Sequence, residues 1–124
     1  MEFRLDRMTW MEAAEALNTA DVCVLPWGSL EQHGPALPLC TDRLIAERLA
    51  ERLIEKAHPH MRLVLLPSVA YGRSPEHMGF AGTVSLGRNA TCETLIGIAT
   101  SLADHGAKRL LIINGHGGNS SALE

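Results

Sequence analysis

Short apolar runs and amphipathic segments alternate along the chain, and this alternation predicts the secondary structure. Three runs are almost wholly apolar, at residues 22–25, 63–66 and 109–113. Runs of this length without polar alternation are typical of strands buried on both faces of a sheet. Pro26 and Pro67 follow the first two runs and are expected to end those strands.

Amphipathic segments lie beside these runs and predict helices. They cover residues 9–18, 43–57 and 95–103. Thr9 and Glu12 have the spacing of a capping box at the start of the first helix. Thr41 or Asp42 is expected to cap the second helix, and Gly106 to end the third in a left-handed conformation.

The order of these elements predicts an α/β fold. Apolar strands that alternate with amphipathic helices indicate a mainly parallel sheet covered by helices on both faces. Residues 67–90 lack a clear period and are interpreted as a long functional loop with a short strand at residues 83–86. We find no internal repeat or linker, so residues 1–124 are interpreted as a single domain. Ligands of such sheets bind beyond the carboxyl ends of the strands.

Side chains that bind metals follow the first and the last of the predicted strands. Glu31 and His33 share one loop, and Asp42 lies at the start of the next helix. In extended backbone Glu31 and His33 would point to the same side. His116 lies in the glycine-rich loop 114–119. Carboxylate oxygen and imidazole nitrogen are ligands of Zn and also suit Mn or Fe, so the two loops are predicted to meet and hold a divalent metal.

Each of these side chains also has a simpler interpretation. Glu31 suits a surface or capping carboxylate, His33 a hydrogen-bonded loop histidine, and Asp42 an N-cap. His116 could belong to a phosphate cradle, because glycine loops before helices bind anions, but its loop lacks the spacing of G-x-G-x-x-G and of the P-loop. The combination of ligand types after two strands is what favours a metal site.

Glu76 and three further histidines lie outside the two motif loops, and their expected positions relative to the metal site differ. Glu76 and His77 lie in the long loop. The loop could bring them to the site, or they could only stabilise the shape of the loop or contact another subunit. His58 and His60 lie between a helix and a strand, and are expected in solvent at the opposite edge of the sheet.

Composition restricts the classes of function. The chain of 124 residues, 46% of them hydrophobic, is long enough for one domain with a core. The net charge of -3, without a basic cluster, predicts no nucleic-acid partner, and no apolar run is long enough to predict a membrane span. The charged start lacks the apolar core of a signal peptide, so a cytoplasmic location is expected. Cys23, Cys40 and Cys92 are odd in number and widely spaced, which is typical of reduced thiols.

Several stretches, taken together and in this order, resemble the creatininase (creatinine amidohydrolase) family. The similar stretches are residues 25–35, 37–42, 71–80 and 113–119. The resemblance covers nearly the whole chain and implies a three-layer α/β/α fold. It also implies a homo-oligomer, often a hexamer, that hydrolyses a small-molecule amide such as a cyclic amide or a formamide.

The resemblance further implies a centre with two divalent metals per subunit, Zn or Mn, with Fe also suitable. Carried over by position, Glu31, His33, Asp42 and His116 would be the metal ligands, with Asp42 bridging the two ions. Glu31, Asp42 and His116 would also be the catalytic residues, because the implied reaction uses a metal-activated water to attack the amide carbonyl.

The sequence also departs from the family pattern. Gly118 stands where creatininase has a glutamate ligand, and Ala36 stands where many members have histidine, so creatinine is not the expected substrate. The chain ends in what looks like the first turn of a helix, so it is expected to be the N-terminal half of a longer, creatininase-like protein. Two alternatives remain, namely a catalytically inactive, truncated binding or assembly module and a phosphate-binding α/β domain.

Overall fold

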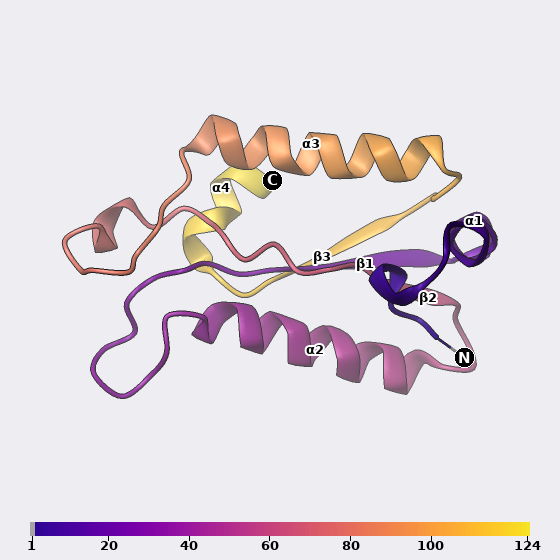
Figure 1. Cartoon of the computed structure of the whole chain (residues 1–124), viewed down its shortest axis with the longest axis horizontal. Helices are drawn as coiled ribbons and strands as arrows, with labels where there is room; N and C mark the ends of the chain where they lie inside the picture. The colour runs from indigo at the N-terminus through magenta and orange to yellow at the C-terminus, as the bar shows by residue number, and fades with distance from the viewer. Residues whose placement is uncertain (1) are drawn as a thin grey trace.

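A parallel sheet of three strands, in the order β2-β1-β3, forms the middle layer of the structure, a computed structural model that describes residues 2–124. The strands are β1 (Val22–Trp27), β2 (Leu63–Leu65) and β3 (Leu110–Asn114). Helix α2 (Thr41–Ala57) covers one face and α3 (Arg88–Asp104) the other, as Figure 1 shows. The remaining elements are α1 (Trp10–Thr19), α4 (Ser120–Leu123) and the 3-10 turns η1 (Leu5–Arg7), η2 (Pro75–His77) and η3 (Gly117–Asn119). The predicted α/β/α layers and parallel sheet are confirmed.

Strand β1 is central and contributes to the core on both faces. Leu25 and Trp27 pack in one cluster with Leu102 of α3, whereas Val24 packs on the other face with Ala50 of α2. This alternation follows from the two-residue period of a strand. A strand that is apolar at every position is therefore required here, and that is the pattern in the sequence.

Helix α2 buries a narrow face made of small residues. Its buried side chains recur every four residues, at Asp42, Ala46, Ala50 and Ile54. The larger apolar side chains beside them remain half exposed, with Leu49 at 54%. Alanine lets the helix axis approach the sheet closely. Because Asp42 continues the alanine face, its carboxylate turns inward at the end of the helix that lies beside the loops.

The predicted end of the first strand and the predicted cap of the second helix were wrong. Pro26 does not end β1, which continues to Trp27, because both residues pair with the end of β3. Neither Thr41 nor Asp42 caps α2. The N-cap is Cys40, which makes no side-chain capping bond, and Asp42 already lies in the first helical turn. The carboxylate expected at the cap is therefore available for other partners.

The start of α1 and the end of α3 agree with prediction, whereas α3 begins at Arg88, inside the stretch 67–90 that was predicted as a loop. Thr9 and Glu12 form a full capping box on α1, and Gly106 ends α3 with a φ of 94°. In the long loop, the short strand expected at residues 83–86 is reduced to isolated bridges at Val84 and Ser85. Among residues 2–124, no helix is long and apolar enough to cross a membrane.

Candidate metal centre

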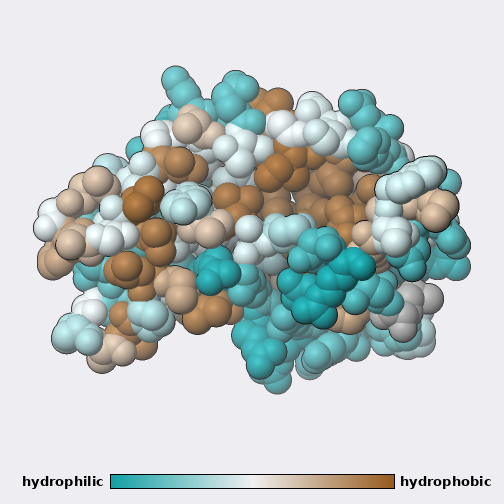
Figure 2. Space-filling view, in the orientation of Figure 1, coloured by the Kyte–Doolittle hydropathy of each residue, from teal (hydrophilic) through white to brown (hydrophobic). Residues whose placement is uncertain are grey.

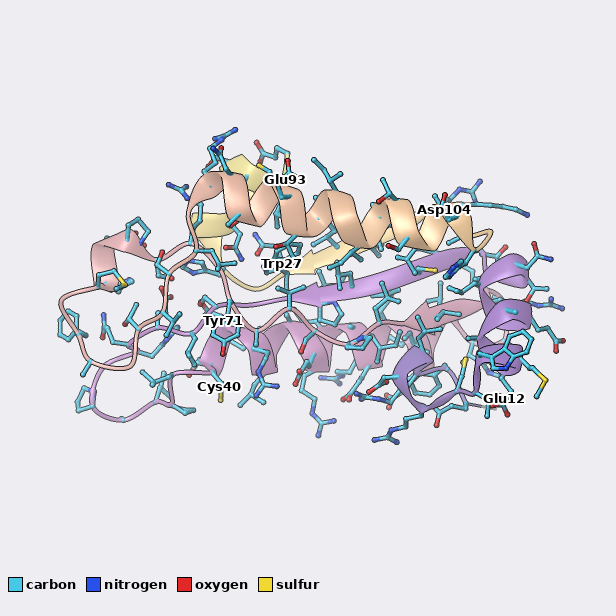
Figure 3. All side chains as sticks on the ribbon, turned by 45° about the horizontal axis from the view of Figure 1, so that its top comes forward. Glu12, Trp27, Cys40, Tyr71, Glu93 and Asp104 are labelled. Atoms are coloured by element: carbon cyan, nitrogen blue, oxygen red, sulfur yellow. The ribbon has the colours of Figure 1, made fainter. Side chains whose placement is uncertain are left out.

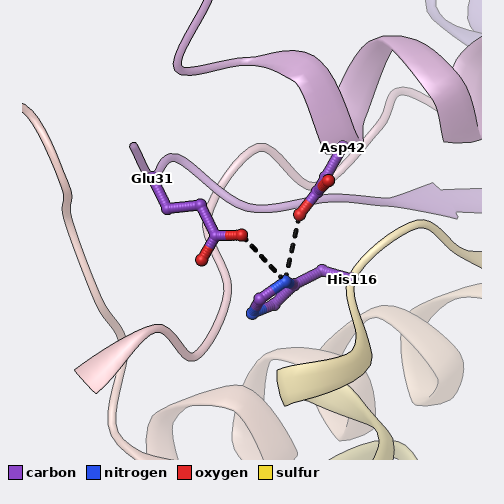
Figure 4. Close-up of side chains that lie close together, drawn as sticks. All are labelled: Glu31, Asp42 and His116. Carbon is purple, nitrogen blue, oxygen red and sulfur yellow. Dashed lines mark ion pairs between the residues drawn. The ribbon is translucent and has the colours of Figure 1, made fainter. Parts of the chain in front are cut away.

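The two motif loops meet beyond the carboxyl ends of β1 and β3, as predicted. Glu31 from the first loop, Asp42 from the first turn of α2 and His116 from the second loop converge there (Figure 4). Each offers a ligand atom within 4.8 Å of the others, and all three residues are buried. His116 Nδ1 lies 3.2 Å from Glu31 Oε1 and 3.0 Å from Asp42 Oδ2.

The protonation of His116 follows from its other ring nitrogen. Its Nε2 lies 2.6 Å from the carbonyl oxygen of Arg73. A carbonyl oxygen can only accept, so Nε2 carries the proton and donates. In the neutral ring Nδ1 then presents its lone pair to Glu31 and Asp42. Three electron-rich atoms face one another at this point, which requires a second proton on the ring or a cation.

His33 repeats the same arrangement on the other side of Asp42. Its Nδ1 lies 3.1 Å from the carbonyl oxygen of Glu31, so Nδ1 donates. The lone pair of Nε2 then points to Asp42 Oδ1 at 2.9 Å and lies 3.8 Å from Glu31 Oε1. Histidines that bind metals commonly donate their second ring N–H to a backbone carbonyl in this way. Asp42 consequently presents one oxygen to each histidine, as a bridging carboxylate would.

His33 and Asp42 shift each other's pKa so that a positive charge is favoured beside an ionised Asp42. Burial lowers the pKa of His33, but the carbonyl of Glu31 and the carboxylate of Asp42 outweigh it, so the pKa of His33 is raised. Burial likewise raises the pKa of Asp42, but the hydrogen bond from Ser29 and the bond that a protonated His33 would donate through Nε2 outweigh it and lower that pKa. The cluster therefore stabilises an ionised carboxylate beside a cation.

Glu31 retains an unused oxygen. Its Oε2 is buried and has no hydrogen-bond partner within residues 2–124. His77 Nε2 lies 3.8 Å from this oxygen, and Glu31, Glu76 and His77 form a second group of possible ligand atoms within 4.8 Å. The long loop therefore does reach the site. Of the interpretations left open for Glu76 and His77, this agrees with the one that places them near the site.

Three polar residues that sequence reasoning missed hold the loops together. Ser29 is fully buried and its Oγ donates to Asp42 Oδ2 at 2.8 Å. Asn119 is also fully buried, donates to the carbonyl of Gly28 at 3.0 Å and accepts from Arg73 N at 2.9 Å. Ser74 Oγ lies 3.3 Å from His116 Nε2. Their positions inside the similar stretches were the available signal, but a serine or asparagine in a loop is uninformative without its partners.

Gly118 has no space for a side chain. A Cβ at this position would collide with the carbonyl oxygen of Arg73 and would lie 2.5 Å from His116 Nε2. A carboxylate ligand is therefore absent from this position and could not be accommodated without a shift of the loop.

Comparisons with known proteins agree with this geometry. The model of the family described as creatininase (creatinine amidohydrolase) matches residues 6–124. The mycofactocin precursor peptide peptidase of Mycobacterium tuberculosis is 42% identical over 112 residues, which cover 86% of this chain and 44% of that protein. The creatinine amidohydrolase of Pseudomonas putida is 34% identical over 119 residues, which cover 91% of this chain and 44% of that protein.

The fold is also similar to that of solved proteins. The manganese form of creatininase superposes with a TM-score of 0.90 at 31% sequence identity, over 99% of this chain and 49% of the solved one. The chain thus spans less than half the length of these relatives. With the family model matched over nearly all of its residues and the motif loops joined at one site, the chain belongs to the creatininase family.

Proposed function

We propose that this chain carries the metal-binding part of a divalent-metal-dependent amide hydrolase. The observation that supports this most strongly is the convergence of Glu31, Asp42 and His116, with the lone pair of His116 Nδ1 aimed at both carboxylates. Neutral imidazole and ionised carboxylates repel one another there unless a positive charge lies between them. The buried, unpartnered Oε2 of Glu31 is a further group that a cation nearby would stabilise.

The donor atoms fit a divalent metal. Glu31, Asp42 and His116 would hold a first ion, and His33 with the second oxygen of Asp42 would hold another. Oxygen and nitrogen ligands suit Zn, Mn and Fe. Bound there, such an ion supplies Lewis acidity toward an amide carbonyl and lowers the pKa of a water. For the second position, residues 2–124 offer only these two atoms at short distance, with Glu31 Oε1 3.8 Å from His33 Nε2.

The chain's own groups orient the ligands. The carbonyl oxygens of Arg73 and Glu31 each accept a hydrogen bond from one histidine ring. The other ring nitrogen of each histidine, which carries the lone pair, therefore faces the site. The hydroxyl of Ser29 keeps Asp42 from rotating away. Because such partners fix ligand geometry before binding, the centre is preorganised rather than assembled around the ion.

Two substrate classes are supported by different observations. The family resemblance favours a non-peptide C–N bond, in a cyclic amide or a formamide. The higher identity with a mycofactocin precursor peptide peptidase favours a peptide amide. The family also supports a homo-oligomer, which light scattering would test.

Hydrolysis assays on the full-length protein test the proposal. Protein loaded with Mn²⁺ or Zn²⁺ is expected to hydrolyse a small cyclic amide, a formamide or a short peptide, and Asp42→Ala and His33→Ala should abolish that activity. His60→Ala is the matched control, because His60 is an exposed histidine outside the motif loops. Full activity in protein stripped of metal, or in Asp42→Ala, would contradict the proposal. Metal binding without hydrolysis of any of the three substrates would favour the non-catalytic binding module.

A further inference from the structure

The side chain of Gln32 determines which nitrogen of His77 carries a proton. Gly34 N–H donates to Gln32 Oε1 at 2.9 Å. The amide nitrogen of Gln32 therefore faces His77 Nδ1, at 2.9 Å, and is the donor. His77 Nδ1 accepts that hydrogen bond, so in the neutral ring the proton lies on Nε2.

The Nε2–H of His77 faces a carboxylate oxygen that lacks a partner. Glu31 Oε2 is buried without a hydrogen bond in residues 2–124, and the Glu31 side chain is 6% exposed. The two atoms are 3.8 Å apart, about 1 Å beyond a normal N–H···O hydrogen bond. The terminal torsion of a glutamate is soft, so a small rotation of the carboxylate would close this gap.

We infer that His77 is a positioning residue that holds Glu31 Oε2, so that Glu31 Oε1 is presented to the cation. This inference rests on the proposed function, because it assigns a role toward the ligand set of that site. Glu31 is then held at both oxygens, by His77 on one side and by the cation with His116 on the other. The chain of contacts runs from Gly34 through Gln32 and His77 to the ligand.

The same geometry argues against His77 as a ligand itself. Its Nε2 lies near Glu31 and Glu76 in a group with the spacing of a metal site. A proton on Nε2 occupies the lone pair that a metal would need. Glu76 is 57% exposed and its carboxylate is 3.9 Å from Nε2, so it competes only weakly for that proton.

Metal affinity of the full-length protein tests this inference. Metal-free protein is titrated with Zn²⁺ against a chromophoric chelator, for the unsubstituted protein, His77→Ala, His77→Gln and the control His60→Gln. Loss of a group that hydrogen-bonds a ligand is expected to weaken binding by roughly 10-fold to 100-fold, so His77→Ala should show that loss. His77→Gln retains an N–H donor at a similar reach and should recover most of the affinity. His60→Gln should be unchanged.

The outcomes separate the inference from the proposed function. If the unsubstituted protein binds no Zn²⁺, the proposed function fails. If it binds Zn²⁺ and His77→Ala binds equally well, the positioning role fails and the metal site stands. Loss of a whole equivalent of Zn²⁺ in both His77 variants would make His77 a ligand and overturn the inference. Should His77→Ala not fold, Gln32→Met removes the amide that fixes the ring: weaker binding supports the role and unchanged binding overturns it.

Discussion

Gly115 lies between strand β3 and His116, and its missing side chain is what lets two of the proposed ligands meet. A Cβ there would collide with the carbonyl oxygen of Asp42 and would lie 3.2 Å from the Cβ of Ala46. Gly28 has the same relation to the start of α2, because its Cβ would lie 2.5 Å from Arg43 Cα. Both loops therefore press glycine backbone against the turn of α2 that carries Asp42.

Gly115→Ala is accordingly expected to weaken the metal site without removing a ligand. The added methyl group must push α2 away from the loop, which separates Asp42 from His116 and costs about 1–3 kcal/mol of folding stability by overpacking. Calorimetric titration with Mn²⁺ and urea unfolding would measure both effects. Gly117→Ala is the matched control in the same loop, because a Cβ there meets nothing within 4 Å. Equal losses in the two variants would contradict this explanation.

At the scale of residues, the side chains proposed as metal ligands could be identified from the sequence, whereas their hydrogen-bond partners could not. Glu31, His33, Asp42 and His116 were identified by chemistry and by their place after strands, and the structure brings them together. The capping role expected for Asp42 was wrong, although its place four residues before the buried Ala46 marks it as an inward residue. Hydrogen bonds such as that from Ser29 depend on tertiary contacts that no local pattern contains.

At the scale of elements, local sequence signals predicted the capped ends of helices more accurately than the extents of strands. The capping box of α1 and the glycine at the end of α3 are local signals, and both were predicted correctly. The extent of β1 depends on its neighbours, since Pro26 and Trp27 belong to the strand through their pairing with β3. The stretch 83–86 makes only isolated bridges for the same reason, because strand length is set by the partners available.

The capping box of α1 gives a prediction on stability. Hydrogen bonds from the backbone and side chain of Thr9 lower the pKa of Glu12 below its ordinary value. Glu12→Ala removes the carboxylate that accepts both hydrogen bonds, so it should lower the free energy of unfolding at neutral pH, measured by urea unfolding. A carboxylate with a depressed pKa contributes stability above its ordinary pKa, and that contribution is lost as the pH falls through the depressed value. The difference in the free energy of unfolding between Glu12→Ala and the unsubstituted protein should consequently narrow in acid.

The control for this prediction is another glutamate of α1. Glu15 is exposed and makes no side-chain hydrogen bond to Thr9. Figure 3 shows that Glu12 lies at the end of the molecule opposite to Cys40 and the start of α2. Neither Glu12→Ala nor Glu15→Ala should therefore change metal affinity. A stability difference for Glu12→Ala that persists unchanged into acid would show that the Glu12 carboxylate does not support the cap.

At the scale of the whole molecule, the candidate chemistry is concentrated at one end of the sheet. The loops at that end carry exposed apolar side chains, with Leu37 at 55% and Phe80 at 57%, and hydrophobic surface is visible there in Figure 2. Parallel strands place their carboxyl ends on one edge, so both loops reach it without any long-range signal in the sequence. Because the strand order alone places the site at this edge, the sequence predicts the layers and the position of the site together. It does not predict the substrate.

The most direct test of the metal centre is a calorimetric titration of the metal-free, full-length protein with Mn²⁺ or Zn²⁺, compared with Asp42→Asn. The asparagine keeps the size of the side chain but removes the charge that faces both His33 and His116. We predict that the unsubstituted protein binds the metal saturably and that Asp42→Asn does not. Circular dichroism should show that both proteins are folded. No binding by the unsubstituted protein, or equal binding by folded Asp42→Asn, would contradict a metal centre built on Glu31, Asp42 and His116.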